Sequence, residues 1–268
     1  MTKLPPSTGW LWIRQGYQYF RKQPLELCSL FLAYLFFVLG MGLVSFVTSE
    51  LLPHLGQFLA FIFLPLFTLS FMQACREIDQ GLRVRPQLIL YGFRSRHRIA
   101  LMLLGLIYFI AACAALWAST WIDGGSFLQF ISGQEELNPA VFEQSNMAGA
   151  MLFAMLVYAP ALMGLWFAGP LIAWQDMPLF KAVFYSFFAT VKSLRVFLVY
   201  VLAWFAVAGI VPAMIVVMIA AMTGSQDLVV MLMLPVSMFS SIILYCTFYP
   251  SYKSIFGQAE TTESSTIS

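Results

Sequence analysis

The most constraining feature of the chain is a set of six apolar stretches that contain no Asp, Glu, Lys, Arg or His. They cover residues 27–47, 55–74, 99–121, 148–173, 196–222 and 229–249. A helix needs about 20 mostly apolar residues to cross the hydrocarbon core of a bilayer, because it rises about 1.5 Å per residue. Strands of an outer-membrane barrel instead alternate apolar and polar residues in short segments. The sequence therefore predicts an all-α integral membrane protein with six transmembrane helices.

The composition agrees with this class, since 61% of the residues are hydrophobic and only 10% are charged, against about 25% charged in soluble domains. The first apolar stretch is too long for the core of a signal peptide, so it is interpreted as a retained span. We expect residues 1–257 to form a single transmembrane domain. The Ser-, Thr- and Glu-rich segment 258–268 is predicted to be a disordered cytoplasmic tail.

The charged residues predict how the spans are oriented. All fourteen Lys and Arg residues lie before span one, in the connections 75–98 and 174–195, or after span six. Six spans place these segments on one side of the membrane. The other side carries acids alone, at Glu50, Asp123, Glu135, Glu136, Glu143 and Asp227. Because short basic loops stay cytoplasmic, we expect a bacterial inner-membrane protein with both termini in the cytoplasm.

Three amphipathic segments precede the odd-numbered spans on this basic side. Before spans one and five, aromatic and aliphatic residues recur at helical spacing, at Trp10, Ile13, Tyr17 and Phe20, and at Phe180, Phe184, Phe187, Val191 and Leu194. The segment before span three, with Leu88, Leu90, Tyr91 and Phe93, has the weakest pattern. Such helices suit the headgroup boundary of a membrane, although they also suit structural elbows packed under the bundle, and the two roles are compatible.

Basic residues in and beside these segments are the candidates for contact with anionic lipid headgroups. They are Arg14, Arg21, Lys22, Arg94, Arg96, Arg98, Lys181, Lys192 and Arg195. The recurrence predicts a threefold repeat of one interfacial helix followed by two spans, in which Tyr19-Phe20-Arg21 aligns with Gly92-Phe93-Arg94. Repeats of this kind occur in transporters.

Catalytic chemistry is sparse in the sequence. Intramembrane charges usually mark ion or proton paths, and the predicted spans contain none. Glu50 and His54 are close enough in sequence to share a proton or a metal, but no third ligand lies near them, so we expect a solvated turn. The cysteines at 28, 75, 113 and 246 lack metal or disulfide spacing. No cofactor, metal site or nucleic-acid partner is expected.

Span four is predicted to be the least regular helix, because proline removes a backbone hydrogen-bond donor. Its kink residues are Pro160, Gly164, Gly169 and Pro170. Packing of neighbouring helices is one interpretation of these residues, and a pocket in the membrane is the other.

Two motifs carry a family resemblance. The first is Trp12, Gly16, Phe20, Arg21 and Pro24; the second is Phe167, Ala168, Pro170, Asp176, Pro178, Ala182 and Ser186. With this layout the chain resembles a family of uncharacterised bacterial six-span inner-membrane proteins. It is distantly similar to the YciC group and to the membrane domain attached to some glycerophosphodiester phosphodiesterases. The resemblance implies no settled activity, since the soluble barrel that would hold metal-binding carboxylates is not part of the chain.

Three functional hypotheses follow. The first is a non-enzymatic accessory or organising component that contacts membrane lipids and a membrane-protein partner or further copies of itself. The alternative is a transporter or carrier of an uncharged or amphiphilic, lipid-like substrate, favoured by the repeat and the prolines. A membrane-embedded enzyme ranks third, because only Glu50 and His54 offer acid or base chemistry.

Overall fold

The structure is a computed structural model that describes residues 4–52, 54–132, 146–223 and 226–266, with side chains at 220–230 and from 258 onward left aside. The described residues form helices joined by turns, with no strand among them. The elements are α1 (Thr8–Lys22), α2 (Pro24–Val47), α3 (Leu55–Asp79), the 3-10 helix η1 (Pro86–Leu90), α4 (Tyr91–Arg94), α5 (Arg98–Asp123), α6 (Ser126–Ile131), α8 (Met147–Leu165), α9 (Ala168–Trp174), α10 (Leu179–Lys192), α11 (Leu194–Trp204), the π-helix η2 (Phe205–Ile210), α12 (Val211–Thr223) and α13 (Gln226–Thr266).

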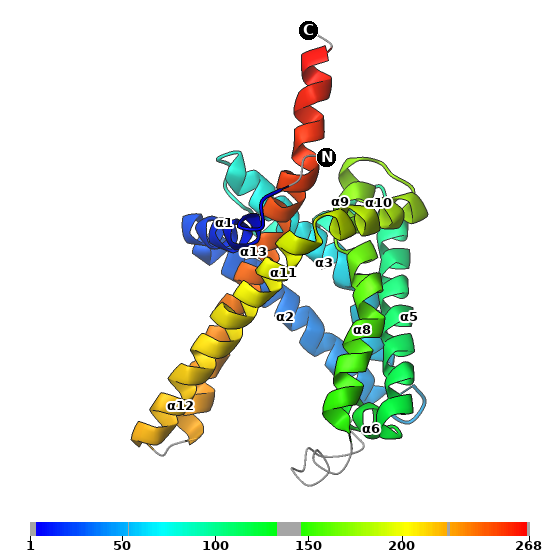
Figure 1. Cartoon of the computed structure of the whole chain (residues 1–268), viewed down its shortest axis with the longest axis vertical. Coiled ribbons are helices and arrows are strands. Elements are labelled where there is room, and N and C mark those ends of the chain that lie inside the picture. Colours follow the sequence, from blue (N-terminus) through cyan, green and yellow to red (C-terminus); the bar gives the residue numbers. More distant parts are fainter. Residues whose placement is uncertain (1–3, 53, 133–145, 224–225, 267–268) are drawn as a thin grey trace. The chain divides into compact units, whose positions relative to one another are not determined.

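Six helical segments in the described part of the chain are long and apolar enough to cross a membrane (Figure 1). They are Pro24–Val47, Leu55–Asp79, Arg98–Asp123, Met147–Trp174, Leu194–Ile219 and Met231–Gly257. These segments overlap the six predicted spans one for one. The prediction of an all-α integral membrane protein is confirmed.

The chain divides into two compact units. One comprises Met1–Gly40, Leu66–Ser95 and Ala189–Ser268, and the other comprises Met41–Pro65 and Arg96–Phe188. The single domain over 1–257 stays a prediction. So does the disordered tail, although α13 is assigned as far as Thr266; residues 267–268 lie outside the described part.

In the first unit, aromatic rings hold α2, α3 and α13 together. Tyr34 of α2 meets Phe67 of α3 with ring centroids 5.2 Å apart and Tyr245 of α13 at 5.9 Å. Phe71 stacks on Tyr245 at 4.7 Å, and Phe31 meets Phe71 at 6.4 Å. Because three of these five rings, Tyr34, Phe71 and Tyr245, each take part in two of the four contacts, this aromatic cluster fixes three helices with few residues.

In the second unit, α5 and α8 lie side by side (Figure 1). Gly105 of α5 approaches Ile62 of α3 so closely that an added Cβ would lie 2.3 Å from the Ile62 carbonyl oxygen. Beyond α5, Asp123 accepts backbone N–H bonds from Gly125 at 2.9 Å and Phe127 at 2.6 Å. These bonds cap the start of α6, which lies in the connection between the third and fourth spans.

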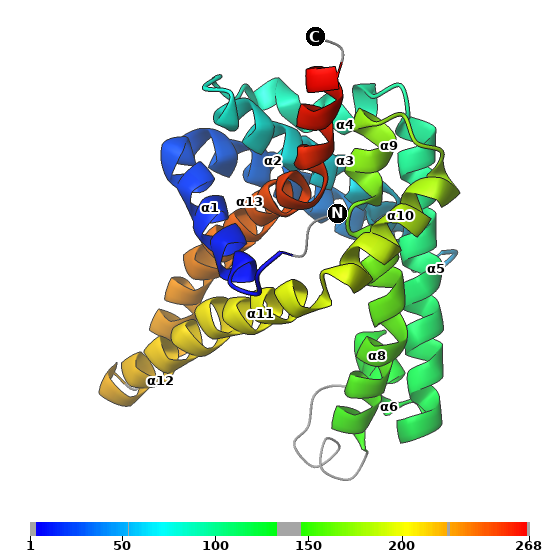
Figure 2. The same ribbon diagram turned by 45° about the horizontal axis from the view of Figure 1, so that its top comes forward.

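The three elements before the odd-numbered spans share one packing relation. Each contacts the second span of another pair: α1 packs on α13, α4 on α3, and α10 on α8 and the start of α9. In the first case Gly16 lies against Ile243 and Thr247; in the second Gly92 lies against Leu66. Figure 2 shows α1 beside α11 and α13. This shared relation supports the predicted threefold repeat, although the second copy is only a 3-10 turn and a four-residue helix.

Candidate functional site

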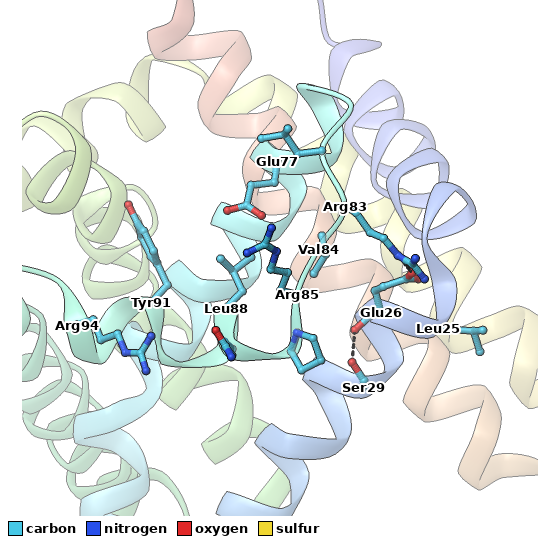
Figure 3. A pocket seen from close by; sticks show the side chains of 13 residues that line it. Leu25, Glu26, Ser29, Glu77, Arg83, Val84, Arg85, Leu88, Tyr91 and Arg94 are labelled. Carbon is cyan, nitrogen blue, oxygen red and sulfur yellow. Dashed lines mark hydrogen bonds and ion pairs between the residues drawn. The ribbon is translucent and has the colours of Figure 1, made fainter.

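A cavity of about 930 Å³ in the first unit lies where α2 begins and α3 ends (Figure 3). We call it the arginine pocket. It is lined by Leu25, Glu26, Ser29, Glu77, Leu82, Arg83, Val84, Arg85, Pro86, Gln87, Leu88, Tyr91 and Arg94. These residues come from the first turns of α2, the last turn of α3, the connection after it, η1 and α4. The pocket is therefore at the end of two predicted spans, on the side that carries the basic residues.

The connection that forms one wall of the pocket starts at a defined helix end. Gly81 has φ +77° and its N–H bonds to the Ile78 carbonyl at 3.1 Å, while the Leu82 N–H bonds to the Glu77 carbonyl at 2.9 Å. This pair of bonds is a Schellman motif, and glycine is favoured in it because it adopts positive φ without strain. The motif turns the chain out of α3 and toward α2.

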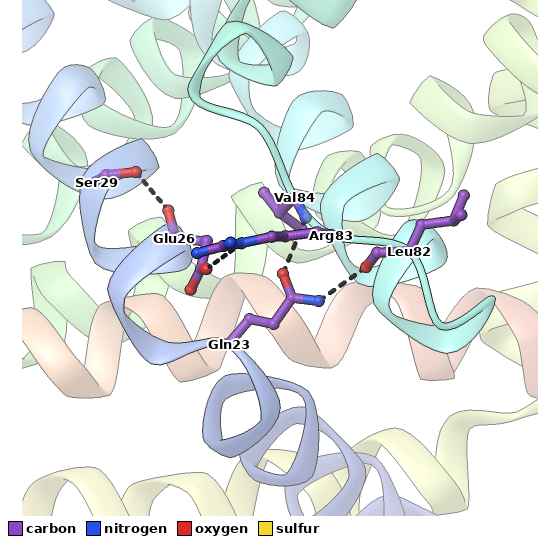
Figure 4. A network of polar contacts seen from close by, with 6 residues as sticks. All are labelled: Gln23, Glu26, Ser29, Leu82, Arg83 and Val84. Atoms are coloured by element: carbon purple, nitrogen blue, oxygen red, sulfur yellow. Dashed lines mark hydrogen bonds and ion pairs between the residues drawn. The ribbon is translucent and has the colours of Figure 1, made fainter.

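One amide side chain then fixes that wall against the start of α2. Gln23 donates from Nε2 to the Leu82 carbonyl at 2.8 Å and accepts from the Val84 N–H at its Oε1 at 2.9 Å (Figure 4). Val84 is buried, so its N–H has no access to bulk water and depends on this acceptor. The Arg83 Nε beside it bonds to Glu26 Oε1 at 3.1 Å. Contacts within the protein alone therefore hold this wall in place.

The charges in the pocket do not cancel. It contains three arginines and two glutamates. Arg83 is paired with Glu26, and Glu77 receives one long bond, of 3.5 Å, from Gln73 Nε2. Arg85 and Arg94 form no ion pair with the described residues, and both are exposed. Guanidinium groups present planar pairs of donors that suit phosphate or carboxylate oxygens. The arrangement can bind one anionic group.

The predicted interfacial helices α1 and α10 both turn aromatic side chains outward. On α1, Trp10 is 49% exposed and Tyr17 50%; on α10, Phe180 is 80% exposed and Phe184 60%. Apart from Ile13, the residues of the buried faces are different from those of the predicted stripes. On α1 they include Gly9, Trp12, Gly16 and Tyr19, and on α10 Ala182, Ser186, Ala189 and Thr190. The prediction that Ile13 lies on the same face as Trp10 is wrong, because Ile13 is only 5% exposed whereas Trp10 is 49% exposed.

The nine headgroup candidates are spread over several elements. Arg14, Arg21 and Lys22 lie on α1, Arg94 on α4, Arg98 on α5 with Arg96 just before it, Lys181 and Lys192 on α10, and Arg195 on α11. Of these nine, only Arg94 lines the arginine pocket. The other two arginines of the pocket, Arg83 and Arg85, are among the fourteen basic residues but were not headgroup candidates. The sequence signal that was missed is the Arg-Val-Arg-Pro run at residues 83–86, which follows the turn glycine Gly81.

A second cluster joins α1, α3 and α13 beside Lys22. The Asp79 carboxylate accepts bonds from Tyr19 at 2.9 Å, from Tyr249 at 3.2 Å and from Lys253 at 2.6 Å. Partial burial, with the bond to Asp79, raises the pKa of the Tyr19 phenol above its ordinary value. Tyr19 therefore stays a proton donor to Asp79. The cluster fastens three helices and has a structural role.

The predicted acid and base pair on the opposite side shows no assembled site. Glu50 and His54 are both exposed, and the His54 ring bonds through Nδ1 to Gln57 Oε1 at 2.9 Å. Over the described residues, no three His, Cys, Asp or Glu side chains form a group able to hold a metal. Glu135, Glu136 and Glu143 of the longest outer connection lie outside the described residues.

Span four is interrupted near its predicted kink residues. Pro160 lies inside α8, while the helix ends at Leu165 and resumes as α9 with Gly169 and Pro170 in its first turn. The interruption is bridged by Ser186 of α10, whose Oγ accepts the Phe167 N–H at 2.9 Å and donates to the Met163 carbonyl at 3.0 Å. A Cβ on Gly164 would lie 3.1 Å from Val183 of α10. Around Gly164 and the interruption the chain is packed against α10, and a pocket there stays a prediction.

Comparison with known proteins gave one relative of nearly equal length. The chain is 36% identical over 265 residues to the probable inner membrane protein BTH_II0599 of Burkholderia thailandensis, covering 97% of this chain and 95% of the relative. No family model matches the chain. No solved structure matches it either.

Proposed function

Because the chain belongs to the same family as the probable inner membrane protein BTH_II0599, we propose that it is a non-enzymatic accessory or organising component of the bacterial inner membrane. In this proposal both termini lie in the cytoplasm. The basic ends of the spans contact anionic lipid headgroups, and the bundle associates with a membrane-protein partner or with further copies of itself. The distant similarity to the YciC group and to the phosphodiesterase membrane domain stays a prediction.

The observation that carries the proposal is that α1 and α10 each present an outer face of the same kind. Each helix packs one face inward and leaves aromatic rings outward beside cations that have no ion-pair partner in the described structure, such as Arg14 and Arg21 on α1 and Lys192 on α10. Rings of this kind enter the membrane interface, while Lys and Arg meet anionic phosphates at about 1 kcal/mol each. Two helices with the same outer design support a role at the lipid surface.

The orientation in the proposal rests on charge. All fourteen basic residues lie in segments that six spans place on one side, and anionic lipids attract them in the cytoplasmic leaflet. The non-enzymatic part is supported by the exposed, unassembled Glu50 and His54. A chain with Glu50→Gln and His54→Asn should therefore restore any deletion phenotype as well as the wild type does.

The proposal is tested by extracting the protein into polymer-bounded native lipid discs. We expect mass spectrometry to find phosphatidylglycerol and cardiolipin enriched over the bulk membrane, together with an oligomer or a second polypeptide at fixed stoichiometry. A lone monomer surrounded by lipid of bulk composition would contradict the proposal. A matched preparation of an unrelated six-span protein in the same discs sets the background.

A further inference from the structure

We infer that the arginine pocket binds the phosphodiester headgroup of a phospholipid in the cytoplasmic leaflet. The inference rests on the proposed function, which it extends from general contact with anionic lipid to one defined site. Its first support is charge. With Arg83 paired to Glu26, the pocket holds Arg85 and Arg94 against the single carboxylate of Glu77. The remaining charge of one cation matches one phosphodiester.

The second support is the direction from which the donors come. Arg85 lies on the connection after α3 and Arg94 on α4, and both side chains line the pocket (Figure 3). Two guanidinium groups that line one pocket from different elements can contact different oxygens of one phosphate. Bonds between ionised partners of this kind are roughly twice as strong as bonds between neutral groups.

The third support distinguishes a lipid from a soluble phosphate. Leu25, which is 80% exposed, and Leu82, which is 53% exposed, also line the pocket. They add apolar surface that a small anion in water would not use. Leu25 also belongs to the first turn of α2, which is the first candidate span of the structure, and this turn lies where the hydrocarbon region gives way to headgroups. A ligand with a phosphate and attached acyl chains fits both parts of the pocket.

The fourth support is that the pocket is formed by its own protein contacts. Gln23 and the Gly81 turn hold the wall that carries Arg83 and Arg85. Pro86, at the first position of η1, further restricts the backbone beside Arg85. A fixed wall reduces the ordering cost of binding.

The test measures binding of dihexanoyl phosphatidylglycerol to the delipidated full-length protein in detergent by calorimetry. Replacing both cations with Arg85→Gln and Arg94→Gln should raise the Kd about tenfold or more, since two charge-assisted contacts are lost. The control is Lys253→Gln, which removes one positive charge from a residue that is not a headgroup candidate and does not line the pocket; its Kd should stay within about twofold of wild type. The two single variants replace the double variant if its gel-filtration profile shows misfolding.

Glycerophosphoglycerol, which has the same phosphodiester without acyl chains, separates the two sources of this chemistry. We expect it to bind at least about tenfold more weakly than the lipid. Equal affinity would overturn the assignment to a lipid in favour of a soluble phosphate. If the wild type binds the lipid and the Arg85 and Arg94 variants bind it equally well, the assignment of the lipid to the arginine pocket is wrong, while the proposed function stands. If neither this lipid nor anionic lipid in native discs associates with the wild type, both fail.

Discussion

The helices α1 and α10 present the same kind of outer face but are anchored in different ways. On α1, side chains make the inward contacts: Trp12 donates from Nε1 to Ser254 Oγ at 2.9 Å, and its ring meets Phe197 at 5.2 Å. On α10, Ser186 bonds to the backbone of the interrupted span four instead. Since the anchors differ and the outward aromatic rings recur, the outer face is the property that the two helices have in common.

The comparison also separates what the family motifs do. Trp12 and Gly16 of the first motif, and Ala182 and Ser186 of the second, are all buried and face inward. Asp176 of the second motif, with φ +49°, bonds to His97 Nε2 at 2.5 Å. These motif residues therefore hold the helices before the spans, and a turn, in place.

Breaking the inward face of α1 at its glycines should give the largest effect. A Cβ on Gly9 would lie 2.4 Å from the Val196 carbonyl oxygen and 2.7 Å from the Tyr200 nitrogen, so Gly9→Ala must displace α1 from α11. We expect a loss of about 3 kcal/mol of stability, seen as a lower melting temperature in detergent. Gly42→Ala is the control, because a Cβ there meets nothing within 4 Å. Equal melting temperatures for the two variants would refute the close packing.

Breaking the anchor of α10 should have the next largest effect. Ser186→Ala leaves the buried Phe167 N–H without its acceptor, which costs about 2 kcal/mol. The exposed Ser237, which bonds only to the Leu234 carbonyl in its own helix, serves as the control in Ser237→Ala. Thermal unfolding followed by circular dichroism compares the two. A loss no larger than the control's would mean that span four does not need this bridge.

The hydrogen bond from Trp12 to Ser254, which helps to anchor α1, should contribute less stability than the Ser186 contacts do. Trp12→Phe keeps an aromatic ring but loses the bond to Ser254, whose hydroxyl still donates to the Ser251 carbonyl at 2.9 Å. A loss of about 1 kcal/mol is expected. Trp10→Phe, on the exposed face of the same helix, should leave the melting temperature unchanged, and the reverse order would show that the faces of α1 are misassigned.

The outer faces themselves should contribute least to folding. Phe184→Cys on α10 removes an exposed ring and is expected to change stability by less than about 0.5 kcal/mol. A nitroxide attached there should be accessible to oxygen dissolved in the lipid and protected from water-soluble nickel chelate. The opposite accessibility would remove the outer face from the membrane interface.

The sequence was sufficient to find the spans because each needs only a long local run of apolar residues. It did not reveal the arginine pocket, which depends on Gln23 meeting Leu82 and Val84, 59 and 61 positions further along the chain. It also misassigned part of α1, since aromatic residues occupy both the buried face, at Trp12 and Tyr19, and the exposed one. Periodicity identifies a helix, but which of two apolar faces packs inward is decided by partners far away in sequence.

The claim on which the account depends most is that the basic ends of the spans lie in the cytoplasm. Alkaline phosphatase fused after Gly257 and after Ser132 tests it directly, because the enzyme is active only when exported. The account predicts an inactive fusion after Gly257 and an active fusion after Ser132. Activity after Gly257 together with inactivity after Ser132 would invert the orientation and contradict the account.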